Sequence, residues 1–322
     1  MDPCTHRLPV TQLSKRCGAP ALSVRYRLAP QHPFPAPLVD GLVAYLSLIS
    51  PPPGSFHKPV AANRIVFMGD SAGGNLSLGL VQALLALQRR GVRSIRFHGR
   101  DVPLELPAGV AGISPWCDMT RSMPSVFRNA PFDYLPPPPE KSYIKYTPLP
   151  WPEDDVWPVQ PPRLDPVVNA DSCVHPMVSP LAARKEVWEG APPIFFSIGE
   201  ELLTDECLIT ARRINEAGVP ITVEQYEGMA HCYGFIILNT PTSKRIFEGL
   251  ANFFRGVTAG YPPGVGNAIC FGSQLRWMRQ VPLEKLPVLG DKEIDDRLRK
   301  SRLLRMEEEG KVVAEWKERA RL

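Results

Sequence analysis

Short apolar runs alternate with longer amphipathic stretches along most of the chain. Five runs have strand length and are rich in β-branched or aromatic residues; they cover residues 20–26, 64–69, 108–114, 193–199 and 220–226. Four longer stretches carry apolar residues at helical spacing; they cover residues 37–49, 73–90, 205–218 and 241–257. Strands separated by helices of this length predict parallel β-α-β units, and therefore an α/β fold whose mostly parallel sheet has helices on both faces.

Proline interrupts this pattern over residues 131–166. The chain holds 37 prolines in 322 residues, and this segment combines many of them with Trp and Tyr. Such a composition excludes a regular helix or a central strand. A disordered linker is one interpretation, but the Trp and Tyr side chains favour an irregular excursion that packs on the domain.

The last part of the chain has a different character. Residues 291–322 mix basic and acidic side chains in nearly equal number, with a few apolar residues between them. This pattern is typical of a solvated helix with salt bridges along its surface. A partner-binding coiled coil is the alternative, although the heptads are few. We expect residues 261–322 to form a charged carboxy-terminal extension.

Composition and charge exclude several classes of function. The formal net charge of +4 is modest and gives little reason to expect nucleic acid or a membrane surface as a partner. The seven cysteines form no CxxC pairs and have no His partners at zinc spacing, which predicts reduced thiols and no metal. The first residues lack the apolar core of a secretory signal, and no window has the length of a transmembrane span. A cytoplasmic protein is the expectation.

One serine lies in a context that suggests nucleophilic catalysis. The stretch Gly69-Asp70-Ser71-Ala72-Gly73 matches G-x-S-x-G and falls between a predicted strand and a predicted helix. At such a turn the serine backbone is strained, its hydroxyl is lifted clear of the sheet, and its neighbours must be small. The N–H of Ala72, at the helix start, can stabilise a developing oxyanion. A phosphate-binding turn is the alternative, but this stretch has neither a P-loop lysine nor G-x-G-x-x-G.

A serine nucleophile needs a base and an acid, which follow it along the chain in this fold. Among six histidines, His231 lies in a loop directly after the last predicted strand, where it can reach Ser71. The loop after the preceding strand supplies three acids, Glu200, Glu201 and Asp205. One of them would hold the imidazole in its working tautomer. Residue chemistry alone does not choose among the three.

Together these motifs resemble the hormone-sensitive-lipase-like esterases of the α/β-hydrolase fold. The resemblance covers roughly residues 18–257. It is carried by "YRLAPQHPFPAPLVDGLVAYL" (26–46), "GDSAGGNLSL" (69–78), "ISPWCDMT" (113–120), "HPMVSPLAA" (175–183) and "GVPITVEQYEGMAHCYGF" (218–235). It implies an α/β-hydrolase domain over residues 1–260 with a lid over about 118–175. It also implies a serine carboxylesterase that needs no cofactor and acts on small-molecule esters of short to medium acyl chains.

The resemblance also assigns roles to residues. Ser71 becomes the nucleophile and His231 the base. The family usually has Asp-x-Leu-x-Asp where this chain has "ELLTD" (201–205), so Glu201 ranks above Asp205 as the triad acid.

Three further residues are candidates for contact with the substrate. Asp70 and Gly73 flank Ser71 at the strand-to-helix turn, the elbow. Trp116 is the third, and together with Trp151 and Trp157 it is a candidate for shaping the acyl or alcohol pocket. Packing in the core explains a tryptophan equally well. The sequence does not indicate an oligomeric state.

One departure from the family concerns the oxyanion hole. Family enzymes carry His-Gly-Gly-Gly before the "YRLAP" stretch, but no two glycines are adjacent in residues 1–63. The resemblance therefore places the start of this chain just after that motif, and we expect weakened activity because backbone donors are missing. The alternatives are a hydrolase-fold protein that binds a small molecule without turnover, as plant gibberellin receptors do, and an inactive truncated paralogue. The presence of His231 favours an enzyme.

Overall fold

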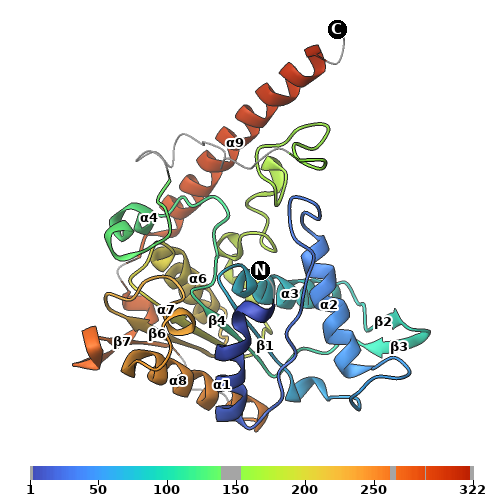
Figure 1. Cartoon of the computed structure of the whole chain (residues 1–322). Helices are drawn as coiled ribbons and strands as arrows, with labels where there is room; N and C mark the ends of the chain where they lie inside the picture. The colour runs from blue at the N-terminus through green and yellow to red at the C-terminus, as the bar shows by residue number, and fades with distance from the viewer. Residues whose placement is uncertain (1–2, 139–153, 262–265, 287, 320–322) are drawn as a thin grey trace.

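A six-stranded sheet forms the centre of the computed structural model, which describes residues 3–138, 154–261, 266–286 and 288–319 (Figure 1). Its strands lie in the order β1 (Val66–Asp70), β4 (Gly109–Ile113), β5 (Ile194–Ile198), β6 (Ile221–Tyr226), β7 (Asn267–Phe271) and β8 (Met278–Pro282). Every neighbouring pair is parallel except β7 and β8. β4 and β5 are buried along their whole length, as expected for strands covered on both faces.

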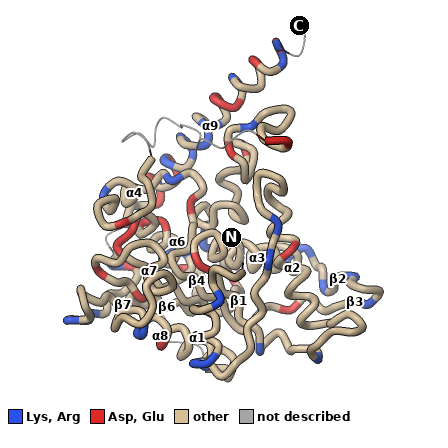
Figure 2. Tube along the Cα trace, viewed as in Figure 1, with Lys and Arg blue, Asp and Glu red and all other residues tan. Residues whose placement is uncertain are grey.

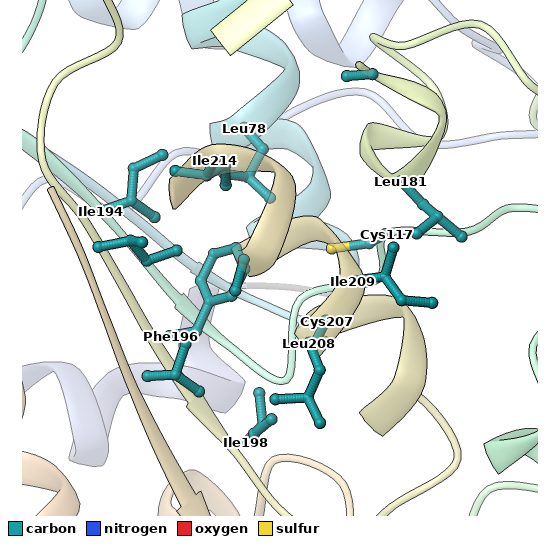
Figure 3. Packing of buried hydrophobic residues seen from close by; sticks show 14 of the residues in the cluster. Leu78, Cys117, Leu181, Ile194, Phe196, Ile198, Cys207, Leu208, Ile209 and Ile214 are labelled. Carbon is teal, nitrogen blue, oxygen red and sulfur yellow. The ribbon is translucent and has the colours of Figure 1, made fainter. Parts of the chain in front are cut away.

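Helices cover both faces of this sheet. One face carries α1 (Arg7–Cys17) and α8 (Pro241–Thr258), and the other carries α3 (Ala72–Arg89) and α6 (Thr204–Glu216), with α2 (Ala36–Ile49) packed on α3. Successive side chains of β5 point to opposite faces of the sheet. Phe195 packs against Phe253 of α8 on one face, and Phe196 lies on the other face with Leu208 of α6 (Figure 3). The parallel arrangement brings the carboxyl ends of β1, β4, β5 and β6 to one edge of the sheet.

Most of the elements expected from the hydrophobic pattern are confirmed. The strands predicted over 64–69, 108–114, 193–199 and 220–226 are β1, β4, β5 and β6. The four predicted helices are α2, α3, α6 and α8. These elements were predictable because their apolar positions enter the core in the helical or strand period.

The strand predicted over residues 20–26 is wrong. These residues run along the surface without regular structure, and Leu22 and Val24 are 57% and 38% exposed. The sheet offers them no pairing, since β4 is the only strand hydrogen-bonded to β1 among the described residues. An apolar run becomes a strand only where its backbone N–H and C=O groups find partners. The apolar pattern alone was therefore not enough to make residues 20–26 a strand.

Four strands lie where the pattern predicts none. β2 (Ser94–Phe97) and β3 (Arg100–Pro103) form a separate antiparallel pair. β7 and β8 lie after residue 260 and continue the central sheet. The apolar pattern does not reveal β8, because this strand lies at the sheet edge, its residues are mostly exposed, and two of its five residues, Arg279 and Gln280, are polar.

The charged tail forms one long helix, α9 (Asp291–Arg319). Ile294 and Leu298 are buried against the body, while the carboxyl end of the helix projects away from it (Figure 1). Basic and acidic residues alternate along its length (Figure 2), and Arg297 pairs with Glu293 one turn away. Like the other helices in the described ranges, α9 is not apolar enough to cross a lipid bilayer.

The connection between β4 and β5 is long and mostly irregular. It holds α4 (Ser125–Arg128), α5 (Lys185–Trp188) and several 3₁₀ turns. The proline-rich excursion belongs to this connection, and residues 139–153, with Trp151, lie outside the described residues. Where the structure describes the excursion, at 131–138 and 154–166, it holds the end of a 3₁₀ turn (Ala130–Phe132) and otherwise no helix or strand.

Candidate active site

Ser71 occupies the turn between β1 and α3. Its φ of 50° and ψ of −117° lie in a region that costs a non-glycine residue about 1–3 kcal/mol. The turn needs glycine at two neighbouring positions. A Cβ on Gly69 would clash with the backbone carbon of Gly73 at 2.1 Å, and a Cβ on Gly74 would clash with Pro115 Cβ at 2.8 Å. Gly73 itself faces open space. The strained backbone expected from the sequence is therefore present at Ser71.

Backbone hydrogen bonds fix this turn to the end of β4. The N–H of Ser71 donates to the carbonyl of Ile113 at 2.9 Å, and the N–H of Trp116 donates to the carbonyl of Ser71 at 3.0 Å. Ala72 is the first residue of α3, so its N–H is one of the amides that lack an acceptor within the helix. It can therefore donate to a charge that develops beside Ser71.

His231 lies in the loop that follows β6 and precedes α7 (Tyr233–Ile236). Its Nδ1 is 2.5 Å from Oε2 of Glu201, and only 3% of the residue is exposed. Burial alone lowers the pKa of His231. The hydrogen bond and negative charge of Glu201, with smaller contributions from Asp133 and Asp70, outweigh burial and raise this pKa above its usual value.

The carboxylate of Glu201 is fully buried and has a partner on each oxygen. Oε1 accepts from the Ser114 hydroxyl at 2.5 Å and from the Gly199 N–H at 3.0 Å, while Oε2 faces His231. Ser114 is itself strained, with a φ of 46°, and its hydroxyl also accepts the N–H of Cys232 at 3.0 Å. This network leaves the carboxylate little freedom to rotate away from the imidazole.

The other two candidate acids have different partners. Asp205 lies 2.5 Å from the guanidinium of Arg128 and accepts the N–H of Ser125. Glu200 accepts the N–H of Gly228. The structure thus brings Glu201, and neither of these two, into contact with His231.

Ser71 and His231 face the same region but are not hydrogen-bonded to each other. The charge of Asp70, next to Ser71 in the chain, is close enough to contribute to the pKa of His231. Within the described ranges, no hydrogen bond joins the Ser71 hydroxyl to the imidazole. Catalytic hydrogen bonds are often long or unformed before substrate binds.

Asp70 has a partner that sequence reasoning missed. Nε2 of His6, just before α1, lies 3.0 Å from Asp70 Oδ2, and the His6 ring is 6.2 Å from that of Phe235. His6 precedes Ser71 along the chain, so the order of triad residues gave no signal for it. These two contacts bring the start of α1 next to Asp70 and to Phe235 of α7.

The tryptophans proposed for substrate contact are engaged in packing. The indole of Trp116 donates to the carbonyl of Asp118 at 2.9 Å, and Trp157 is buried under the guanidinium of Arg163. Neither contact tests a role in binding. For the residues that the structure describes, no group of three His, Cys, Asp or Glu side chains is arranged to hold a metal ion.

Comparison with known proteins places this geometry in context. A family described as "alpha/beta hydrolase fold" matches residues 1–145 and 163–235. The chain is 28% identical over 265 residues to an acetyl-hydrolase of Streptomyces hygroscopicus, a match that covers 80% of this chain and 72% of the relative. The structure is similar to that of EstE5 soaked with p-nitrophenyl butyrate (TM-score 0.60, 28% identity, 80% of this chain and 73% of the other). It is also similar to an esterase from the bacterial hormone-sensitive lipase family (TM-score 0.57, 26% identity, 80% and 72%).

Proposed function

Because the chain belongs to the hormone-sensitive-lipase-like branch of the α/β-hydrolase-fold family, we propose that it hydrolyses carboxylic esters of short to medium acyl chains. The observation that carries the proposal is the buried contact between His231 Nδ1 and Glu201, placed at the same sheet edge as the strained Ser71. Esterases among the similar proteins agree with this reaction class. In the proposal Ser71 is the nucleophile, His231 the base and Glu201 the acid.

The first half of the proposed reaction acylates Ser71. The Ser71 oxygen attacks the ester carbonyl carbon while Nε2 of His231 takes the hydroxyl proton, and the carbonyl π electrons move onto oxygen. The N–H of Ala72 stabilises this oxyanion. When the tetrahedral intermediate collapses, the C–O bond to the alcohol breaks and His231 returns the proton to the departing oxygen.

The second half regenerates the enzyme. His231 removes a proton from water as the water oxygen attacks the acyl carbon, and the resulting intermediate expels Ser71, which recovers its proton. Throughout, Glu201 accepts the Nδ1–H of the imidazole, so that Nε2 stays available and the imidazolium is stabilised. Ser114 and Gly199 hold the second carboxylate oxygen, which prepares Glu201 for this role before substrate arrives.

Ala72 is the oxyanion donor that we assign in this proposal. Removing one donor from such a hole costs about 10²–10³ in kcat. We also propose that the segment over about 118–175 and Trp116 shape the pocket for the acyl or alcohol group.

A fluorophosphonate probe tests the proposal, because it reacts only with a serine that a base has activated. We expect the chain to be labelled at Ser71 and to release p-nitrophenol from a short-chain p-nitrophenyl ester. Ser71→Ala should abolish both, whereas the control Ser47→Ala, on α2, where the Ser47 hydroxyl donates to the Val43 carbonyl of the same helix, should keep both. Labelling of Ser71→Ala equal to that of the parent would show that the nucleophile is elsewhere. Binding of ester without labelling or turnover would favour a non-catalytic binding protein.

A further inference from the structure

The stretch from Ser125 to Asp133 is tied to the loop that carries Glu201. The Ser125 hydroxyl donates to the carbonyl of Leu202 at 2.6 Å, and the side-chain amide of Asn129 donates to the carbonyl of Glu201 at 2.9 Å. Arg128 forms its ion pair with Asp205 at the start of α6. All of these contacts reach residues 201–205 and none of them reaches the loop of His231.

Asp133 is different because its carboxylate contacts both loops. Oδ2 accepts the N–H of Leu202 at 2.8 Å, one residue beyond Glu201. Oδ1 accepts the N–H of His231 itself at 3.3 Å. Within the described ranges, the His231 N–H has no other acceptor. One side chain thus joins the backbone of the residue proposed as base to the backbone beside the residue proposed as acid.

We propose that Asp133 is a positioning residue, which fixes the His231 loop against the Glu201 loop and so sets the alignment of the imidazole. The inference rests on the proposed hydrolase function and deepens it. Glu201 holds the ring of His231 and Ser114 holds the N–H of Cys232, whereas Asp133 is the one acceptor of the His231 N–H in the described part of the chain. Without it, this loop could shift relative to β5 while the ring remains hydrogen-bonded.

A carboxylate suits this role better than an amide does. Both oxygens of Asp133 accept main-chain N–H groups, whereas an asparagine offers one acceptor and turns its NH₂ toward the other donor. The negative charge also favours the imidazolium, together with the charges of Glu201 and Asp70. The ring of Tyr134, the next residue, lies 6.2 Å from the His231 ring, so the same anchor places an aromatic side chain beside the base.

The test compares Asp133→Asn in the full chain with a matched control. Asp154→Asn is the control for the loss of a carboxylate charge, because Oδ1 of Asp154 accepts the main-chain N–H groups of Val156 and Trp157 and its carboxylate bonds to neither loop of the site. The first readout is the far-downfield NMR signal of the His231–Glu201 proton, assigned by its loss in Glu201→Gln, and its titration with pH. The second is the rate at which the fluorophosphonate labels Ser71.

We expect Asp133→Asn to move the His231 titration to lower pH, because a negative charge that favours the imidazolium is removed. The labelling rate should fall by roughly 10²-fold, the effect of an error of about 1 Å in the position of a catalytic group. The control should match the parent in both readouts.

Unchanged titration and labelling in Asp133→Asn would overturn the proposal. Global unfolding of this variant would also overturn it, since a positioning role leaves the fold intact. If the parent itself is not labelled, the proposed hydrolase function fails, while the NMR titration still decides whether Asp133 positions His231.

Discussion

The closest backbone approach at the elbow leads to a sharp prediction for Gly69→Ala. The new Cβ would lie 2.1 Å from the carbon and 2.2 Å from the oxygen of Gly73, both of them backbone atoms that cannot rotate away. To restore the 3.4 Å of ordinary van der Waals contact, the end of β1 and the start of α3 must separate by about 1.3 Å. Ser71 and Ala72 lie between these two points, so both must move.

A displacement of about 1 Å at a catalytic group can cost 10²-fold in rate. We therefore expect Gly69→Ala to lower the fluorophosphonate labelling rate by at least about 10²-fold per folded molecule, with the folded fraction measured by circular dichroism. Gly310→Ala, on α9, is the matched control, because its Cβ meets nothing within 4 Å and alanine favours a helix by about 1 kcal/mol over glycine. It should fold at least as stably and be labelled at a similar rate. Labelling of Gly69→Ala at the parent rate would refute the argument that this contact shapes the elbow.

Two further predictions concern the acid and the base. Glu201→Gln should slow labelling by orders of magnitude, because an amide cannot fix the imidazole tautomer. Asp205→Asn should mainly lower the melting temperature, because Asp205 loses its contacts with Arg128 and Ser125. A greater loss of labelling rate per folded molecule in Asp205→Asn would reverse this assignment. The labelling rate of the parent should rise with pH through a midpoint above the ordinary value of about 6.5, since the base acts when neutral and the pKa of His231 is raised. Because the pKa of His231 is raised on folding, protonated His231 stabilises the folded state fully below a pH of about 6.5. This contribution to the free energy of unfolding is lost as the pH rises through the raised pKa. Melting temperatures measured across that pH range would detect the loss.

The sequence was a good guide wherever a residue's role follows from its immediate context. The apolar runs identified β4, β5 and β6 because central parallel strands are buried on both faces, and β1 because its apolar side chains are half-buried against the core. The elbow at Ser71 was predictable because its turn needs small residues between a strand and a helix. The order of catalytic residues in the fold predicted the loop after β6 for His231, and its role as the base stays a prediction.

The remaining features depend on contacts between distant parts of the chain. The choice between Glu201 and Asp205 as partner of His231 needed the structure, since both are acids near the start of the same helix. His6 and Asp133 reach the site from segments far from it in sequence, and no local pattern marks them. The strand prediction over residues 20–26 was wrong for the same reason, because a strand needs a neighbouring strand to pair with, and the run itself does not contain one.

The strand that leads into Ser71 lies at one edge of the described part of the sheet, and this affects how the candidate site responds to heating. Among the described residues, β1 is hydrogen-bonded to β4 alone, whereas β4, β5 and β6 are each bonded on both sides. Edge strands open locally at a smaller free energy than the strands inside a sheet. The elbow therefore follows an edge strand, while the Glu201 loop follows a fully enclosed strand. On warming, Ser71 should lose its alignment before the hydrophobic core between β5 and α6 begins to melt.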